Sequence, residues 1–144
     1  MSEPPSRRDT GDRAERAAER FLQEHGYRIL ARNWRCAAGE ADLVAEQGEV
    51  LIFVEVKARS GGEYGPGREA VGPGKQRKLS RVAEQYCKWQ RLSGRSIRFD
   101  IVEVELDEDG RPQRLNLLPG AFGAPEPRLR RPNRPARRGP WRAR

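Results

Sequence analysis

The eight residues Val50–Lys57 constrain the fold of this chain more than any other segment. Their nearly continuous run of β-branched, aliphatic and aromatic side chains is typical of a central strand covered on both faces of a sheet. Only Glu55 and Lys57 are charged, and because they lie two apart on one strand, both side chains point to the same face. Buried charges are costly unless they are paired, bind a metal or face a solvated cleft. The sequence therefore predicts a sheet with a charged pair on its central strand.

A helix is expected before the first strands, from about Arg13 to His25. Its small and apolar residues recur at helical spacing, with Asp12 as the cap and Gly26 as the stop. Residues 1–11 are expected to form a flexible N-terminus.

The remaining elements follow from alternation and turn signals. Two strands and a tight hairpin turn are expected before Val50, at residues 27–34, 40–46 and 47–49. After Lys57 we expect a Gly-rich loop at 59–74, a strand at 97–105, a turn at 107–110 and a short edge strand at 115–118.

A second helix is expected between the loop and residue 97. Its apolar face holds Leu79, Val82, Ala83, Tyr86 and Trp89, and its basic face holds Arg77, Lys78, Arg81 and Lys88. The order α-β-β-β-α-β predicts an α/β fold, a mixed sheet flanked by helices.

The basic charge of this 144-residue chain is concentrated at its end. Residues 122–144 carry eight Arg and one Glu, a net of +7 against +8 for the whole chain, and five of the eleven Pro. We expect a disordered tail there and a folded domain at 12–121. Two interpretations of the tail stay open: it binds nucleic acid through counterion release, or it only increases solubility.

Cysteine and histidine usage excludes two kinds of site. Cys36 and Cys87 lie far apart, and His25 is the single histidine, so a disulfide framework and a zinc cluster are not expected. No apolar run has membrane-spanning length, and the N-terminus has no hydrophobic signal segment. We expect a soluble, cytoplasmic protein that binds no membrane.

Asp42, Glu55 and Lys57 are the candidate chemical centre. A hairpin turning near Gly48 sets Asp42 roughly opposite residues 53–55, within reach of Glu55. Mg²⁺ binds through one or two carboxylates plus water and phosphate oxygens, and it lowers the pKa of its bound water. Two carboxylates and a lysine are therefore the parts that phosphodiester hydrolysis needs. The alternative is an ordinary ion pair on a solvated strand, with Asp42 at the surface.

These residues also carry a resemblance to a known family. The stretches 39–45 and 51–59 resemble the YraN-like family of small bacterial proteins, and the resemblance covers about residues 11–104. Further matching positions are Gly11, Glu15, Ala18, Leu22, Gly26, Asn33, Trp34, Tyr64, Gly65, residues 69–71, Lys75 and residues 98–100. The resemblance implies a restriction-endonuclease-like fold, similar to archaeal Holliday-junction resolvases.

The resolvase pattern implies four site residues: Glu15, Asp42, Glu55 and Lys57, with Asp42 and Glu55 as ligands of Mg²⁺ or Mn²⁺. For Glu15 a second interpretation stays open, since Asp12 and Glu15 are spaced like a capping box. Because the similar resolvases are dimers, a homodimer is one assembly to consider.

Other residues around this centre are further candidates. Lys75, Lys78 and Arg81 on the second helix are candidates for phosphate contacts, with a solvated helix face as the alternative. Glu40 is a weaker site candidate and Asp100 a structural one. Tyr64 either stacks on a base or packs against the loop.

The sequence is therefore compatible with three functions. The first is a Mg²⁺-dependent endonuclease acting on DNA, such as branched or damaged DNA. The second is a nucleic-acid-binding module without catalysis. The third is an interaction protein that docks on ribosomal RNA or an acidic partner.

Overall fold

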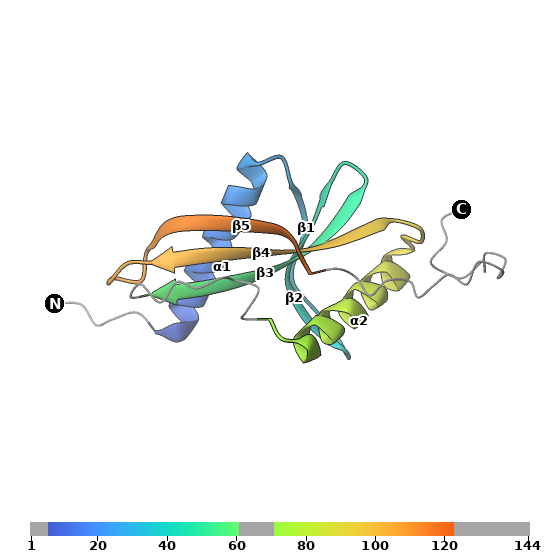
Figure 1. The fold of residues 1–144 in the computed structure, drawn as a ribbon, viewed down its shortest axis with the longest axis horizontal. Helices are drawn as coiled ribbons and strands as arrows, with labels where there is room; N and C mark the ends of the chain where they lie inside the picture. The colour runs from blue at the N-terminus through green and yellow to red at the C-terminus, as the bar shows by residue number, and fades with distance from the viewer. Residues whose placement is uncertain (1–5, 61–70, 123–144) are drawn as a thin grey trace.

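The computed structural model describes residues 6–60 and 71–122. They form a five-stranded sheet with two helices, in the order α1, β1, β2, β3, α2, β4, β5 (Figure 1). The strands lie in sequence order across the sheet; β3 and β4 are parallel and the other neighbours are antiparallel. The predicted mixed α/β architecture and element order are confirmed, and β3 occupies the expected central position.

The first helix, α1 (Arg7–Glu24), begins earlier than expected. Its N-cap is Ser6, whose side chain accepts a hydrogen bond from the Asp9 amide at 3.1 Å. The predicted start near Arg13 with an Asp12 cap is therefore wrong, because the helix already begins at Arg7 and Ser6 caps its first turn. The helix ends at the expected place, and Gly26 follows with a φ of +87°.

The strands are longer than the apolar patterns suggested. They span β1 (Arg28–Cys36), β2 (Gly39–Gln47), β3 (Val50–Ser60), β4 (Ser96–Leu106) and β5 (Pro112–Phe122). The hairpin turn between β2 and β3 is confirmed, with Gly48 at a φ of +60°. The edge strand β5 was predicted only at 115–118; pairing with β4 extends it at both ends. Its last residue, Phe122, stacks on Phe99 at 4.9 Å between ring centroids.

The second helix, α2 (Pro73–Gln90), packs on the opposite face of the sheet from α1. One core cluster joins Ala14, Ala18 and Leu22 of α1 to β2, β3 and β4. The other joins α2 to the reverse face through Leu79, Val82, Ala83, Tyr86 and Cys87. Trp89 was expected on this apolar face, but it is 71% exposed. Near the end of the helix the buried residues are Tyr86 and Cys87, so Trp89 lies outside the buried face.

Several expectations lie outside the described residues. These are the central part of the 59–74 loop with Tyr64, and the basic tail beyond Phe122. At the margins of that loop, residues 59 and 60 belong to β3, and residues 73 and 74 belong to α2. The boundaries of the domain stay a prediction. Neither helix within residues 6–60 and 71–122 has the length and apolarity needed to cross a membrane.

Candidate functional site

The candidate site lies where β2 and β3 separate. Their ladder runs from the pair Gln47–Val50 to the pair Leu43–Val54. Beyond it, the amide of Val56 donates to Oδ2 of Asp42 at 2.8 Å, so a carboxylate takes the place of a backbone acceptor. The predicted register, with Asp42 opposite residues 53–55, is confirmed. It brings Asp42 into electrostatic contact with Glu55.

Two lysines neutralise the carboxylate of Glu55. This residue is only 6% exposed, and burying a carboxylate without a cation is strongly unfavourable. Nζ of Lys57, on the same strand, lies 3.6 Å from Oε2 of Glu55. Nζ of Lys75, from the first turn of α2, lies 2.5 Å from the same oxygen. Lys75 was predicted as a phosphate contact, and in the structure it is the closer cation at Glu55.

Asp42 is the most perturbed acid of the site. Burial and the neighbouring charge of Glu55 raise its pKa to about 7, and the charge of Glu15 adds to the rise. The amide of Val56 and the ammonium of Lys75 oppose it. A carboxyl group that is half protonated near neutral pH is typical of functional sites, although buried structural networks also produce such shifts.

Asp42 and Glu55 face a cleft of about 590 Å³ between the sheet and α2. Its lining residues are Gly39, Glu40, Asp42, Glu55, Gly74, Lys75, Lys78, Leu79 and Val82. Lys78, a predicted phosphate contact, lines this cleft together with the acidic pair, whereas Arg81 is exposed on α2 and does not line it. Glu40 forms an ion pair with Arg35 at 3.1 Å, which agrees with its interpretation as a solvated edge charge.

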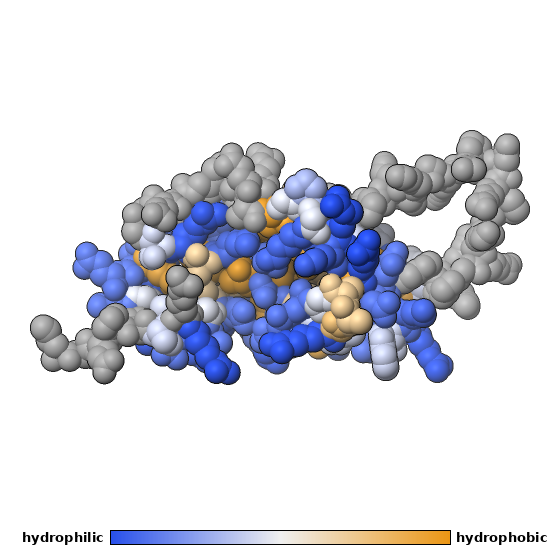
Figure 2. Space-filling view, turned by 90° about the horizontal axis from the view of Figure 1, so that it is seen from below, coloured by the Kyte–Doolittle hydropathy of each residue, from blue (hydrophilic) through white to orange (hydrophobic). Residues whose placement is uncertain are grey.

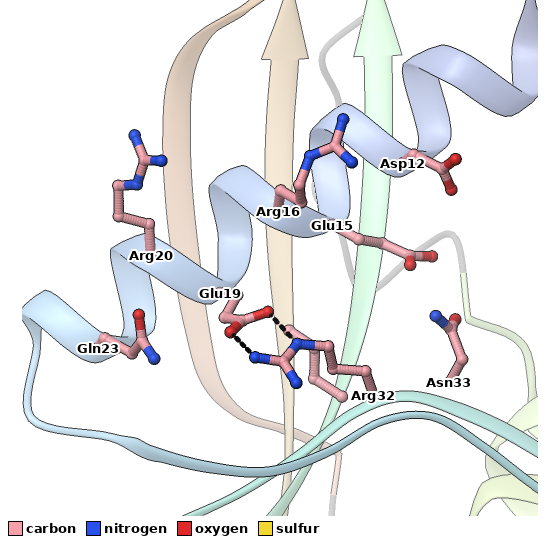
Figure 3. A pocket seen from close by; sticks show the side chains of 9 residues that line it. Asp12, Glu15, Arg16, Glu19, Arg20, Gln23, Arg32 and Asn33 are labelled. Atoms are coloured by element: carbon pink, nitrogen blue, oxygen red, sulfur yellow. Dashed lines mark hydrogen bonds and ion pairs between the residues drawn. The ribbon is translucent and has the colours of Figure 1, made fainter.

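Glu15 lies on α1, in a neighbouring cleft of about 490 Å³ against β1 and β2 (Figure 3). Burial raises its pKa, and the charges of Asp12, Glu40 and Glu55 act in the same direction, whereas hydrogen bonding from Asn33 opposes the rise. Glu15 thus interacts electrostatically with both predicted metal ligands without sharing their cleft. The capping-box interpretation of Glu15 is wrong, because Asp12 lies inside the helix and Ser6 is the cap.

A further carboxylate was not found from the sequence. Glu103 of β4 is the ladder neighbour of Lys57 in β3, and adjacent residues of paired strands point to the same face. It is 2% exposed; Asn116 donates to its Oε1 at 3.2 Å, and its Oε2 has no hydrogen-bond partner in the described structure. A buried oxygen without a donor is stabilised by a bound cation or water. The alternation of acidic residues at 103 and 105 was the sequence pattern that could have indicated this carboxylate.

The donor set suits a hard cation that needs few protein ligands. No group of three or more His, Cys, Asp or Glu side chains within residues 6–60 and 71–122 is close enough to enclose a metal. Mg²⁺ does not require one, since it binds one or two carboxylates and fills its other positions with water and phosphate oxygens. Asp42 and Glu55 are two carboxylates of this kind, and a cation beside them would offset the charge of Glu55, which helps to raise the pKa of Asp42.

Comparison with known proteins identifies the family. Residues 14–104 match the model described as "Uncharacterised protein family UPF0102". The chain belongs to the UPF0102 family. A UPF0102 protein of Symbiobacterium thermophilum is 49% identical over 117 residues, which are 81% of this chain and 98% of that protein. Those of Moorella thermoacetica (44%, the same shares) and Pelobacter propionicus (46%, 74% of this chain and 78% of that protein) are also similar. The resemblance to the YraN-like family is thereby confirmed.

Proposed function

We propose that this UPF0102 protein is a metal-dependent nuclease with a restriction-endonuclease-like fold, which hydrolyses phosphodiester bonds of DNA, such as branched or damaged DNA. The observation that carries the proposal is the convergence of Asp42 and Glu55 at the opening between β2 and β3, with two lysines at the same carboxylate. The element order and the central β3 strand agree with the proposed fold.

Asp42 and Glu55 would hold Mg²⁺ or Mn²⁺ in this proposal. When bound, the cation supplies charge for the phosphate oxygens and a lower pKa for water. Lys57 would orient the attacking water or neutralise charge that develops on the phosphate, because its ammonium group borders Glu55 on the same strand face. Lys75 would exchange its contact with Glu55 for a contact with a phosphate group of the substrate.

The outer face of α2 is the proposed DNA-binding surface. Arg77, Lys78 and Arg81 are exposed, and none of them has an ion-pair partner within residues 6–60 and 71–122. Seen from below, the molecule presents a mainly hydrophilic surface (Figure 2). By contrast, each of the exposed arginines of β1, Arg28, Arg32 and Arg35, is paired with a glutamate. Unpaired cations are free to replace the counterions of a phosphate backbone.

The test is a cleavage assay with the full chain on branched, single-stranded and duplex DNA, with Mg²⁺ or Mn²⁺. Cleavage should occur with the wild-type protein and fall by at least about 100-fold in Glu55→Gln and Lys57→Ala, which remove charge at the centre. Glu105→Gln is a matched control, since Glu105 lies further along β4 and is only part-buried beside exposed Arg114. If no substrate is cleaved, or if Glu55→Gln cleaves as fast as the wild type, the catalytic proposal is wrong.

A nucleic-acid-binding module without catalysis is the second candidate. It is favoured by the 2.5 Å contact between Lys75 and Glu55, because the acidic pair is then neutralised by the protein itself. This function predicts salt-dependent binding that survives Glu55→Gln and weakens when the chain is cut after Phe122, the last residue of β5. The cytoplasmic location, the homodimer and docking on ribosomal RNA or an acidic partner stay predictions from the sequence.

A further inference from the structure

Asn33 has an unusual backbone for a strand residue. It lies within β1 with a φ of +47°, in the left-handed region that only glycine adopts without cost and that asparagine tolerates better than most residues. The ladder between β1 and β2 pairs Arg32 with Leu43 and Trp34 with Ala41. Asn33 therefore occupies the position opposite Asp42, between two regular pairs. Unfavourable backbone conformations persist where the surrounding structure holds them, often at functional sites.

This backbone conformation places the side chain of Asn33 in the α1 cleft with Glu15. Figure 3 shows its amide group below the carboxylate of Glu15, which projects from α1 toward the same space. The cation of β1 in this cleft is already engaged, because Arg32 forms a two-point ion pair with Glu19. Asn33 is thus the uncharged polar side chain of β1 that lies in the cleft with Glu15, next to the strand position of Asp42.

We propose that Asn33 is a positioning residue, whose amide holds the carboxylate of Glu15 toward the opening between β2 and β3 so that Glu15 supports cation binding by Asp42 and Glu55. The inference rests on the proposed function of that site. It agrees with the electrostatic contact of Glu15 with Asp42 and Glu55, and with the effect of Asn33, which opposes the raised pKa of Glu15. Loss of a side chain that orients a metal ligand typically weakens metal affinity by about 10- to 100-fold.

The backbone conformation of Asn33 allows its side chain to be removed without strain. Asn33→Gly removes the amide while keeping a residue that adopts a φ of +47° without strain, so the fold should be retained. Asn33→Ala removes the same amide but strains the backbone. Comparing the two variants separates the loss of the side chain from the loss of stability. We expect thermal unfolding to be little changed in Asn33→Gly and to occur at lower temperature in Asn33→Ala.

The decisive experiment is a double-mutant cycle on Mn²⁺ affinity, measured by calorimetry with the full chain. Asn33→Gly and Glu15→Ala should each weaken Mn²⁺ binding by about tenfold. The double variant should bind no more weakly than Glu15→Ala alone, because Asn33 acts through Glu15. Additive losses, an unchanged affinity in Asn33→Gly, or an unchanged affinity in Glu15→Ala would each overturn the inference.

Cleavage kinetics separate this inference from the proposed function. If the protein cleaves DNA, Asn33→Gly should lower kcat and leave KM for DNA unchanged, since no DNA contact is lost. A wild-type protein that shows the coupled Mn²⁺ affinities without cleavage would refute the nuclease and keep the role of Asn33. Cleavage that depends on Lys57 but not on Asn33 would support the nuclease and refute the role of Asn33.

Discussion

Nζ of Lys75 lies 2.5 Å from Oε2 of Glu55, so the first turn of α2 is joined to the centre of the sheet by an ion pair. Burial disfavours the charge of Lys75, but its hydrogen bond to Glu55 and the charges of Glu55 and Asp42 outweigh burial and raise its pKa. The ammonium group therefore stays charged and occupies an oxygen that a divalent cation would use. Lys75 and the cation should compete.

Removing Lys75 should strengthen cation binding. We expect Lys75→Met to bind Mn²⁺ several-fold more tightly than the wild type at pH 8.5, because a competing positive charge is gone and Asp42 is ionised there. Near pH 6 the gain in Mn²⁺ affinity should be smaller. Lys75 helps to lower the pKa of Asp42, so the variant holds more protonated Asp42 at this pH. Calorimetric titration measures both affinities. Lys88→Met, on the exposed last turn of the same helix, is the control; weaker binding in Lys75→Met at pH 8.5 would contradict competition.

The metal-free protein should lose stability as the pH rises toward 7. Burial first, and then the charge of Glu55, raise the pKa of Asp42 from 3.8 to about 7 in the folded state. Between these values the folded protein holds a proton that the unfolded chain releases. The contribution of Asp42 to the free energy of unfolding is therefore complete below pH 4 and is lost as the pH rises through 7. For one proton, the slope of the free energy of unfolding against pH approaches about 1.4 kcal/mol per pH unit.

Urea denaturation of the metal-free protein at several pH values tests this linkage. Asp42→Asn keeps an acceptor for the Val56 amide and removes the titrating group, so its stability should no longer carry this slope. Glu40→Gln removes an exposed carboxylate that is paired with Arg35, and it should retain the slope. An unchanged slope in Asp42→Asn would mean that another group binds the proton.

The elements and the register of the central hairpin could be predicted from the sequence because their signals are local. The apolar run Val50–Lys57, the turn at Gly48 and the two-residue spacing of Glu55 and Lys57 specify β3, its partner β2 and the face of the charged pair. The same reasoning placed Asp42 beside Glu55, where the structure has it.

Contacts between distant elements could not be predicted in the same way. Lys75 approaches Glu55 only because α2 packs across the sheet, and no pattern within the helix specifies that contact. The start of α1 was missed because Asp9, Thr10 and Gly11 have low helix propensity, whereas the Ser6 cap stabilises the extended helix. The left-handed conformation of Asn33 was not predicted either, because asparagine within a strand was its only local signal.

Asp100 should be essential for stability and dispensable for chemistry. It is fully buried and accepts hydrogen bonds from the hydroxyl of Tyr27 at 2.9 Å, from Arg98 at 2.8 and 2.9 Å, and from the amide of Gly120 at 2.9 Å. Arg98→Ala leaves this carboxylate without its counter-charge and should cost about 3 kcal/mol. Tyr27→Phe removes one neutral donor and should cost about 1 kcal/mol.

Urea denaturation measures both losses. Arg114→Ala breaks an exposed ion pair with Glu105 and should cost less than about 1 kcal/mol. Cation affinity should be unchanged in Tyr27→Phe, because the Asp100 network is separate from the cleft that holds Asp42 and Glu55. A loss of affinity without a loss of stability would instead assign Asp100 and its partners to the site.

The proposed DNA-binding surface of α2 can be tested through its salt dependence. Each cation that contacts a phosphate contributes about one to the slope of the logarithm of affinity against the logarithm of salt concentration. Lys78→Ala with Arg81→Ala should therefore lower the slope by about two and weaken binding to all DNA sequences alike. The matched control is Arg28→Ala with Arg35→Ala, which removes the same net charge from arginines that are already paired with Glu46 and Glu40. Equal slopes in the two double variants would show that affinity follows net charge alone, and that α2 is not the surface that contacts DNA.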